Sequence, residues 1–245
     1  MQFAGKTFIV TGAGSGIGRT TTLRLIELGA RVIASDLLSD RIEALEREVG
    51  SDAVIGVVGD LCDAATIASI VASSPTVDGL VSVAGVTDHW LPAAEIDDET
   101  WQRVFDTNVT APMRLTRAVL PGMIERGAGA IVYVSSEAGF RSSISGAAYT
   151  SSKHALNGFT KSVAFYYGRK GIRANAVAPG GVNTNIDASF HSAYAAEVTA
   201  PILQNAVTAS VEPEVITKSI LWLLSDDSEN VNGVILPTDG GWTTI

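Results

Sequence analysis

Apolar and polar positions along the chain follow two alternating patterns. Short runs that are apolar at most positions and rich in β-branched residues predict seven strands: Lys6–Thr11, Ala30–Asp36, Ala53–Asp60, Val77–Val83, Ala130–Ser135, Ile172–Val177 and Val234–Thr238. Between them, helical spacing of apolar residues predicts helices at Ile17–Leu28, Arg41–Glu48, Ala64–Ala72, Asp98–Arg126, Tyr149–Gly168 and Pro213–Leu224. Strands apolar on both sides are typical of parallel sheets, so the alternation predicts an α/β fold with a doubly wound, seven-stranded parallel sheet.

One stretch departs from this alternation. Asn185–Val211 fits no strand and has weak helical periodicity. Because it follows the sixth predicted strand, we expect residues 185–211 to form a lid over a ligand site. No linker, repeat or low-complexity tract interrupts the rest of the chain, so we expect a single domain over residues 1–245.

Composition and charge exclude several classes of protein. The chain has 245 residues, of which 46% are hydrophobic and 18% charged, as expected for a globular domain. Its net charge of −9 argues against a nucleic-acid-binding surface. The single cysteine, Cys62, excludes an intrachain disulfide and most cysteine-based metal sites, and fits a reducing cytoplasm. We expect no metal, no signal peptide and no membrane span, because a strand begins by Lys6 and no apolar run is long enough.

A glycine-rich turn at residues 11–18, Thr-Gly-Ala-Gly-Ser-Gly-Ile-Gly, joins the first predicted strand to the first helix. Glycines there permit a tight turn and close approach of the backbone to a phosphate, and the helix N-terminus attracts the anion. Alone, the turn is equally typical of an ordinary strand–helix connection. Its place between a strand and a helix favours a dinucleotide site and a Rossmann fold.

The residue that ends the second predicted strand, Asp36, bears on the choice of dinucleotide. A carboxylate there accepts hydrogen bonds from the adenosine ribose hydroxyls and repels the 2′-phosphate of NADP. No Arg or Lys stands at Ser15, Leu37 or Leu38 to bind that phosphate. Asp36 could also be a turn residue, but this pattern favours NAD over NADP as the cofactor.

Three residues further along the chain suggest proton transfer. Ser136 precedes Tyr149 by thirteen residues, and Lys153 follows Tyr149 by four. Residues four apart lie on one face of a helix, and an ammonium beside a phenol lowers the phenol pKa. Such a tyrosine can exchange a proton with an alcohol or ketone. Together with a nucleotide turn, this arrangement predicts hydride transfer to or from a carbonyl carbon.

These motifs resemble the classical short-chain dehydrogenases/reductases (SDR) over nearly the whole chain. The resemblance rests on residues 11–18, Asn108, Ser136, the Tyr149/Lys153 pair and the run 179–184, Pro-Gly-Gly-Val-Asn-Thr. It implies that the catalytic residues are Asn108, Ser136, Tyr149 and Lys153. Tyr149 would be the acid/base, Ser136 would bind the substrate oxygen, Lys153 would bind the nicotinamide ribose, and Asn108 would hold a water in a proton relay.

The resemblance also implies a set of cofactor contacts, including Asp60 at the adenine and Thr184 at the nicotinamide carboxamide. The residues expected to bind the dinucleotide are Gly12, Ser15, Gly16, Ile17, Gly18, Asp36, Asp60, Leu61, Ala84, Gly85, Tyr149, Lys153, Pro179, Gly180, Val182 and Thr184. One position departs from the family pattern: residues 82–85 read Ser-Val-Ala-Gly, where the family has an asparagine before Ala-Gly. That asparagine ties the central strands together, so its loss affects a structural hydrogen bond rather than the chemistry.

The sequence therefore predicts a cytoplasmic oxidoreductase that transfers a hydride between NAD(H) and a secondary alcohol or ketone. Two alternatives stay open, an NADPH-dependent 3-oxoacyl thioester reductase and a non-catalytic dinucleotide-binding regulator. The resemblance and the aromatic-rich Tyr149–Gly168 helix imply a homotetramer. For the small-molecule substrate, a sugar, a hydroxy acid, a terpene alcohol and a steroid all fit the pattern. Residues 86–96, 137–148 and 185–211 are expected to shape its pocket, with His89 and Trp90 among the candidates.

Overall fold

The computed structural model describes residues 1–142, 145–206 and 208–244. Its seven strands form one sheet in the order β3-β2-β1-β4-β5-β6-β7, with every pairing parallel. The strands are β1 Thr7–Thr11, β2 Arg31–Asp36, β3 Val54–Val58, β4 Gly79–Ser82, β5 Gly129–Val134, β6 Ile172–Pro179 and β7 Ile235–Thr238. The predicted doubly wound, seven-stranded sheet is confirmed.

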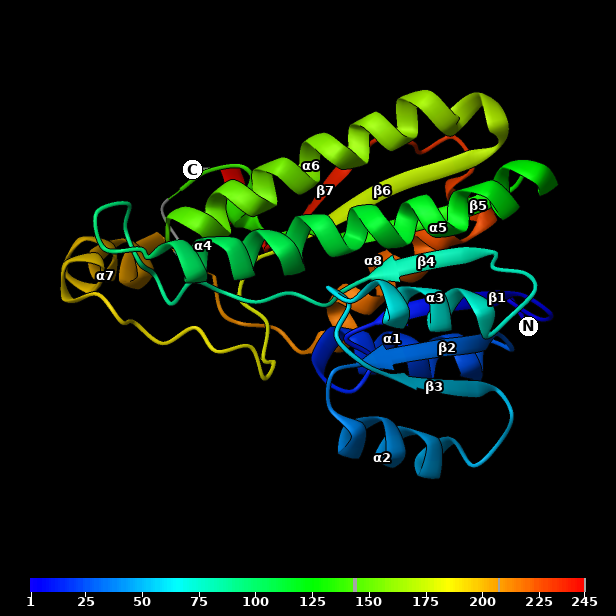
Figure 1. The fold of residues 1–245 in the computed structure, drawn as a ribbon. Coiled ribbons are helices and arrows are strands. Elements are labelled where there is room, and N and C mark those ends of the chain that lie inside the picture. Colours follow the sequence, from blue (N-terminus) through cyan, green and yellow to red (C-terminus); the bar gives the residue numbers. More distant parts are fainter. Residues whose placement is uncertain (143–144, 207, 245) are drawn as a thin grey trace.

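Helices cover both faces of this sheet (Figure 1). One face packs against α1 (Gly16–Glu27), α2 (Ser39–Val49) and α8 (Pro213–Leu224), where Leu25, Leu45 and Ile220 are fully buried. The other packs against α3 (Ala64–Ala72), α5 (Ala111–Arg126) and α6 (Ala147–Tyr167), around Ile9, Leu80 and Ile131. Burial on both faces explains why the strand sequences are continuously apolar.

The predicted Asp98–Arg126 helix is not a regular α-helix throughout. It consists of α4 (Asp98–Phe105), a π-helical turn at Asp106–Thr110, and α5. Asn108 lies in the π-turn and is 1% exposed. Single π-turns within helices occur often at functional sites, because the extra residue turns a side chain in a direction that a regular helix does not allow.

The segment expected to be an irregular lid contains a helix that sequence periodicity did not predict, α7 (Ala193–Ala206). Its small and polar residues give a weak apolar stripe, which is why the pattern missed it. Residue 207, within the expected lid range, lies outside the described residues, as do residues 143 and 144 of the expected substrate loop. In Figure 1, α7 lies beyond the ends of the strands toward which the β2 and β4 arrows point.

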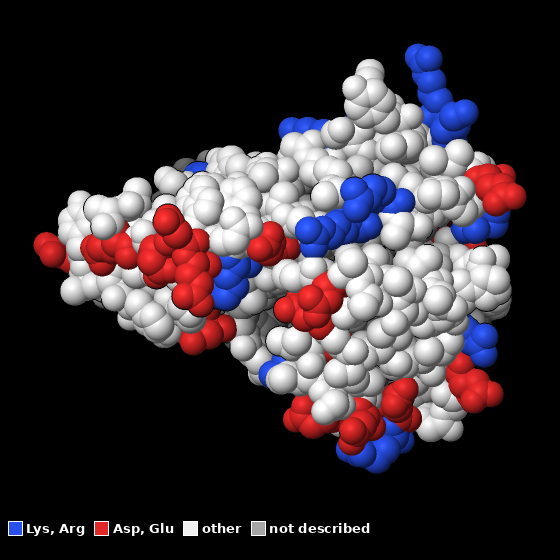
Figure 2. Space-filling model, viewed as in Figure 1, with Lys and Arg blue, Asp and Glu red and all other residues white. Residues whose placement is uncertain are grey.

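Charged side chains are scattered over the face drawn in Figure 2, and no broad basic patch is present on it. The same view shows the surface hollowed between the end formed by α7 and the part formed by α1 and α2. Among the described residues, no helix is both long and apolar enough to cross a lipid bilayer. The same residues contain no cluster of His, Cys, Asp or Glu side chains suited to a metal ion.

Candidate active site

A cleft of about 640 Å³ runs along the carboxyl ends of the strands. This edge is where doubly wound sheets bind ligands. The cleft is lined by every predicted site residue except Gly18 and Asn108. Residues from the turn after β1, the ends of β2 to β6 and the first turns of α6 thus meet in one place, as the sequence predicted.

The glycine-rich turn forms a cradle at one side of the cleft. Gly12 has a φ of +63°, and a Cβ added to it would lie 3.1 Å from the backbone of Ala84. A Cβ on Gly18 would overlap the Gly12 carbonyl, which explains why Gly18 supports the turn without lining the cleft. Helix α1 begins at Gly16. The side chain of Ser15, which stands at the N-cap position, makes no hydrogen bond to the N–H groups of the first turn. N–H groups that no side chain caps, beside a glycine backbone without side chains, fit the pyrophosphate of a dinucleotide.

The missing family asparagine is compensated at the end of β1. The hydroxyl of Thr11 accepts the N–H groups of Val83 (3.0 Å) and Ala84 (3.2 Å), which joins the ends of β1 and β4. The central strands are therefore tied together despite the Ser-Val-Ala-Gly sequence at 82–85.

The side chain of Asp36 is 8% exposed and lines the cleft at the end of β2. Its carboxylate accepts the N–H groups of Gly14 (2.9 Å) and Leu38 (3.1 Å), which fix its position beside the glycine-rich turn. Sequence reasoning missed a cation close to it. Arg41, from α2, also lines the cleft and donates to the Ser15 hydroxyl at 3.3 Å. The five-residue spacing between Asp36 and Arg41 does not indicate that the two side chains lie close together, because their proximity depends on how α2 packs on β2.

Three side chains converge at the other end of the cleft. Ser136 follows β5 and its hydroxyl accepts the N–H of Ala138 at 3.1 Å, while Tyr149 and Lys153 lie in the first two turns of α6. Ser136 is near enough to act on the pKa of the Tyr149 hydroxyl, and the Lys153 Nζ lies 5.3 Å from the centre of the Tyr149 ring. The neighbouring Ser135 instead bonds Asn157 at 2.6 Å, so its hydroxyl has a structural partner. The choice of Ser136 over Ser135 agrees with this geometry.

The pKa values at this cluster differ from the expectation that Lys153 lowers the Tyr149 pKa. Burial raises the pKa of Tyr149 to about 12, the hydrogen bond with Ser136 opposes that rise, and the charge of Asp88 adds to it. Burial also lowers the pKa of Lys153 to about 8, and its Nζ donates to the Val134 carbonyl at 3.0 Å. Burial outweighs the hydrogen bond with Ser136, so the Tyr149 pKa is raised in the described structure, opposite to the expected direction.

Asn108 lies behind the cleft rather than in it. Its side chain accepts the Val86 N–H (2.9 Å) and donates to the Val86 carbonyl (2.9 Å) and the Ser152 hydroxyl (3.1 Å). These bonds tie the loop after β4 to α6. The side chain of Asn108 thus helps to position α6, and its role in a water relay stays a prediction.

Asp88 is a further residue that sequence reasoning missed. It lies in the loop after β4, is fully buried, and reaches the N-terminus of α6. Its carboxylate accepts the N–H groups of Tyr149 (2.8 Å), Gly146 (3.2 Å) and Trp90 (3.3 Å). A carboxylate at a helix N-terminus is stabilised by the free N–H groups and the helix dipole. In the sequence, only the place of an acidic residue three positions after Gly85, at the ligand-binding edge of the sheet, could have indicated a role for Asp88.

The model of the short chain dehydrogenase family matches residues 6–195. The chain belongs to the short-chain dehydrogenase/reductase family. It is 36% identical to the short-chain dehydrogenase/reductase olcF of Penicillium canescens, over 98% of this chain and 97% of that protein. It is 35% identical to 3beta-hydroxysteroid dehydrogenase 2 of Eggerthella lenta, over 98% and 95% of the two chains. The protein is therefore an SDR oxidoreductase.

Solved SDR structures have the same fold. A putative NAD(P)-dependent gluconate 5-dehydrogenase from Beutenbergia cavernae, with bound NADP, gives a TM-score of 0.87 at 34% identity over 100% and 99% of the two chains. A 3-oxoacyl-[acyl-carrier protein] reductase from Brucella melitensis, with bound NAD, gives 0.87 at 30% identity over 99% and 92%. Both nicotinamide dinucleotides thus occur among the structural neighbours of this SDR enzyme, and its own cleft fits such a cofactor.

Proposed function

We propose that this SDR enzyme transfers a hydride between NAD(H) and a secondary alcohol or ketone. The observation that carries the proposal is the convergence of Ser136, Tyr149 and Lys153 in one cleft, whose far end holds the glycine cradle and Asp36. A dinucleotide spanning the cleft from Asp36 to Lys153 would place its redox-active ring beside the two hydroxyl groups. A binding protein without chemistry has no need of hydroxyls and a buried ammonium at that end.

The mechanism follows from the side chains. When bound, the nicotinamide ring accepts the hydride that leaves the carbinol carbon during alcohol oxidation. Ser136 donates a hydrogen bond to the substrate oxygen and orients it, and the Tyr149 phenolate takes the hydroxyl proton. Lys153 holds positive charge beside the Tyr149 ring, which stabilises the phenolate once it forms. In ketone reduction, the neutral Tyr149 returns the proton to the oxygen.

We assign NAD as the preferred cofactor on the position of Asp36. Its charge lies in the cleft where a 2′-phosphate would have to sit, and burial prevents solvent from screening it fully. Arg41 supports NADP as a second candidate, because its guanidinium lies on the same rim and binds Ser15. The carboxylate is held rigidly by two backbone N–H groups, whereas the bond of Arg41 to Ser15 is long, so we weight Asp36 more heavily.

We further propose that the enzyme is a homotetramer in the cytoplasm. Phe165 and Tyr166, at the end of α6, are 78% and 68% exposed. Exposed adjacent aromatic side chains are typical of protein interfaces. The one cysteine, Cys62, is a free thiol, as is usual in a reducing compartment.

Replacement of Tyr149 by Phe tests the catalytic assignment. The ring and its packing remain, but the transferable proton is lost, and general acid–base catalysis typically contributes about 10²–10⁴-fold. We expect turnover on secondary alcohols to fall at least about 100-fold, with little change in the dissociation constant for NADH measured by fluorescence titration. Near-normal turnover of Tyr149→Phe would show that another group transfers the proton.

A further inference from the structure

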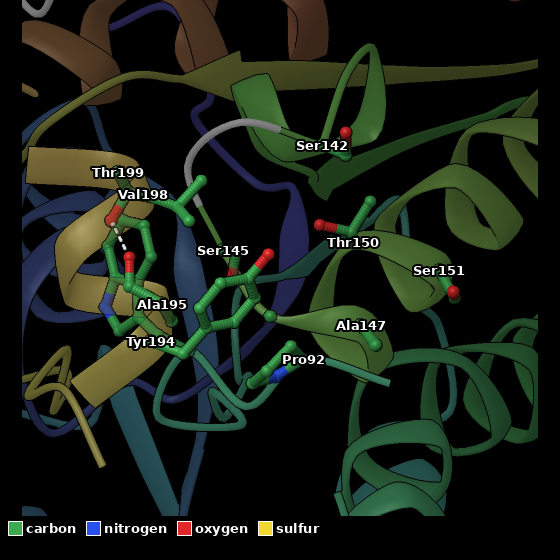
Figure 3. Close-up of a pocket in the computed structure, with 12 residues that line it drawn as sticks. Pro92, Ser142, Ser145, Ala147, Thr150, Ser151, Tyr194, Ala195, Val198 and Thr199 are labelled. Carbon is green, nitrogen blue, oxygen red and sulfur yellow. Dashed lines mark hydrogen bonds between the residues drawn. The ribbon is translucent and has the colours of Figure 1, made fainter. Parts of the chain in front are cut away.

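The turn that carries Ser136 contains an ion pair that lies outside the ligand cavities. Glu137 follows Ser136 in a 3₁₀ turn and is fully buried, and its Oε1 accepts the Nε–H of Arg141. Neither Glu137 nor Arg141 is among the described residues that line the catalytic cleft, or the second cavity of about 350 Å³ that Ser142 helps to line (Figure 3). The pair can therefore act on a bound ligand only through its neighbours.

Arg141 joins this turn to the C-terminal end of the chain. Its Nη2 donates to the carbonyl of Trp242, and its Cζ lies 5.9 Å from the centre of the Trp242 ring. Trp242 is 5% exposed and begins the last helical turn of the described residues. One guanidinium thus bonds a carboxylate next to Ser136 and a carbonyl 101 residues beyond its own position. We call these contacts of Glu137, Arg141 and Trp242 the C-terminal lock.

The C-terminal turn at residues 239–242 is itself held in place. The carboxylate of Asp239 accepts the N–H of Gly241 at 3.0 Å and the N–H of Thr243 at 2.7 Å. A Cβ added to Gly180, which lines the cleft, would lie 3.1 Å from the Cβ of Asp239. The turn therefore packs against the wall of the cleft and gives the lock a fixed support.

The place of the Ser136 hydroxyl depends on the place of the whole turn. The hydroxyl accepts the N–H of Ala138 at 3.1 Å, and the Ser136 carbonyl accepts the N–H of Gly139 at 2.9 Å. From α6, the side chain of Asn157 donates to the Gly139 carbonyl at 2.9 Å. The C-terminal lock is a second tie between this turn and a distant segment. If the lock opened, the turn and the hydroxyl would be free to shift together.

Stability alone does not account for a buried ion pair at this place. Burial raises the pKa of Glu137, the hydrogen bond and charge of Arg141 oppose that rise, and the charge of Asp239 adds to it. The Glu137 Oε2 is buried and has no hydrogen-bond partner among the described residues. Apolar side chains of similar volume often stabilise a fold as well as a buried ion pair, or better. Residues that depart from such a rule are expected at functional sites.

We propose that Glu137 and Arg141 are positioning residues, which fasten the Ser136 turn to the C-terminal turn and so hold the Ser136 hydroxyl where it binds the substrate oxygen. This inference rests on the proposed hydride transfer, in which Ser136 orients the substrate. The lock acts on the geometry of a hydrogen-bond donor and touches neither substrate nor cofactor. A misplacement of about 1 Å at a reacting group can cost ~100-fold in rate, so a small shift of the turn is measurable.

Apolar replacement of the pair separates position from stability. The double variant Glu137→Leu/Arg141→Met removes both charges, so the folded state should be kept, as measured by thermal unfolding. Its kcat on a secondary alcohol that the wild type oxidises should fall about 10- to 100-fold, with little change in the dissociation constant for NADH. Glu43→Leu/Arg47→Met is the matched control, because these residues form an exposed ion pair with the same four-residue spacing, and it should keep the wild-type kcat. A wild-type kcat for the first variant would overturn the proposal.

Removal of the Ser136 hydroxyl decides whether the lock acts through it. In a Ser136→Ala enzyme there is no hydroxyl to displace, so adding the double replacement should lower kcat by less than about 2-fold. A general loosening of the fold would instead multiply the two losses, and that outcome would overturn the proposal. Glu137→Gln keeps the shape of the side chain and removes only its charge. It repeats the comparison if the double variant does not fold, with an expected loss of at least about 3-fold in the enzyme that retains Ser136.

Amide hydrogen exchange without ligand separates this inference from the proposed function. In the double variant, the N–H groups of Ala138 and Gly139 should exchange faster than in the wild type, and so should those of the C-terminal turn at 239–242, because the two turns lose their connection. If no secondary alcohol is oxidised with NAD or NADP, the proposed function fails, but faster exchange in both turns would still support the lock. Unchanged exchange in either turn would overturn it.

Discussion

The carboxylate of Asp88 accepts the backbone N–H of Tyr149 at 2.8 Å. A residue from the loop after β4 thus holds the first turn of α6 by its main chain, while the Tyr149 side chain faces the cleft. The same charge contributes to the raised pKa of Tyr149. Asp88 is therefore a positioning residue that links helix geometry to the acidity of Tyr149, the proposed proton-transfer group.

The first prediction concerns this link. Asp88→Asn removes the negative charge, so the Tyr149 pKa should fall. Because oxidation needs the phenolate, the rising limb of the pH–rate profile should move to lower pH. The substitution also replaces one acceptor oxygen by an NH₂ group, so the helix cap weakens and the melting temperature should decrease.

Asp97→Asn is the control for this experiment. Asp97 caps α4 by accepting the Thr100 N–H at 2.7 Å, and it does not line the catalytic cleft. The Asp97→Asn variant should have a lower melting temperature than the wild type, but the same pH–rate profile. An unchanged profile for Asp88→Asn would mean that its charge does not act on Tyr149.

The second prediction concerns the stability cost of Lys153. Burial lowers its pKa from the ordinary 10.5 to about 8. Between these pH values the unfolded chain binds more protons at Lys153 than the folded one, so the free energy of unfolding rises as the pH increases from about 8 to 10.5. At pH 7 the buried charge of Lys153 therefore lowers the free energy of unfolding by ~3 kcal/mol, relative to its value above pH 10.5. Lys153→Met removes this cost and loses one hydrogen bond worth about 1 kcal/mol.

The Lys153→Met variant without ligand should therefore melt several degrees above the wild type at pH 7, and the difference should shrink by pH 10.5. Thermal unfolding at the two pH values measures this. Lys161→Met, an exposed lysine on the same helix, should show no such dependence. A lower melting temperature for Lys153→Met at pH 7 would contradict the burial argument. The variant should also be catalytically impaired, so stability and activity move in opposite directions.

The third prediction concerns cofactor choice. Each charged hydrogen bond from Asp36 to a ribose hydroxyl is worth about 1.5–3 kcal/mol, so NADH should bind more tightly than NADPH. Asp36→Ala combined with Leu37→Arg should shift the preference toward NADPH. Arg41→Ala should shift it the other way, because Arg41 is the cation on that rim. Fluorescence titration gives the dissociation constants of NADH and NADPH for each variant. Equal or tighter binding of NADPH by the wild type would refute the assignment of NAD as the preferred cofactor.

The fourth prediction concerns the lid. Its first part packs on the loop after β4: Trp90 stacks on Phe190 with ring centres 4.4 Å apart, and the His191 N–H donates to the His89 carbonyl at 3.0 Å. His89 and Trp90 have φ values of +53° and +64°, which are costly for such residues. We expect amide hydrogen exchange in residues 185–206 to be fast without ligand and slower with NAD and substrate, while β6 is unchanged. Strong protection before ligand is added would argue against a moving lid.

The fifth prediction concerns assembly. Light scattering should give four times the chain mass of 25.5 kDa. Replacing Phe165 and Tyr166 together by Ser should reduce this mass, since both exposed rings are expected at a subunit contact. Val58→Ser, at an exposed apolar residue of β3, should leave it unchanged. A wild-type mass near that of a single chain at micromolar concentration would rule the tetramer out.

The sequence by itself determined the sheet, most of the helices and nearly all of the cleft. These features depend on local regularities. Continuous apolar runs define parallel strands, glycines define the cradle at 11–18, and the four-residue spacing of Tyr149 and Lys153 defines one helix face. Once the strands are parallel, their carboxyl ends meet at one edge, so Ser136, Asp36 and Thr184 come together without further information.

Only the tertiary structure decided the remaining features, because they depend on distances between segments far apart in the chain. The contact between Asp88 and Tyr149 and the place of Arg41 beside Ser15 both depend on how elements pack. Helix α7 carries too weak an apolar stripe to be recognised by periodicity. The direction of the Tyr149 pKa shift is decided in the same way. Spacing places Lys153 four residues away, but burial of the phenol, which the sequence does not encode locally, raises its pKa.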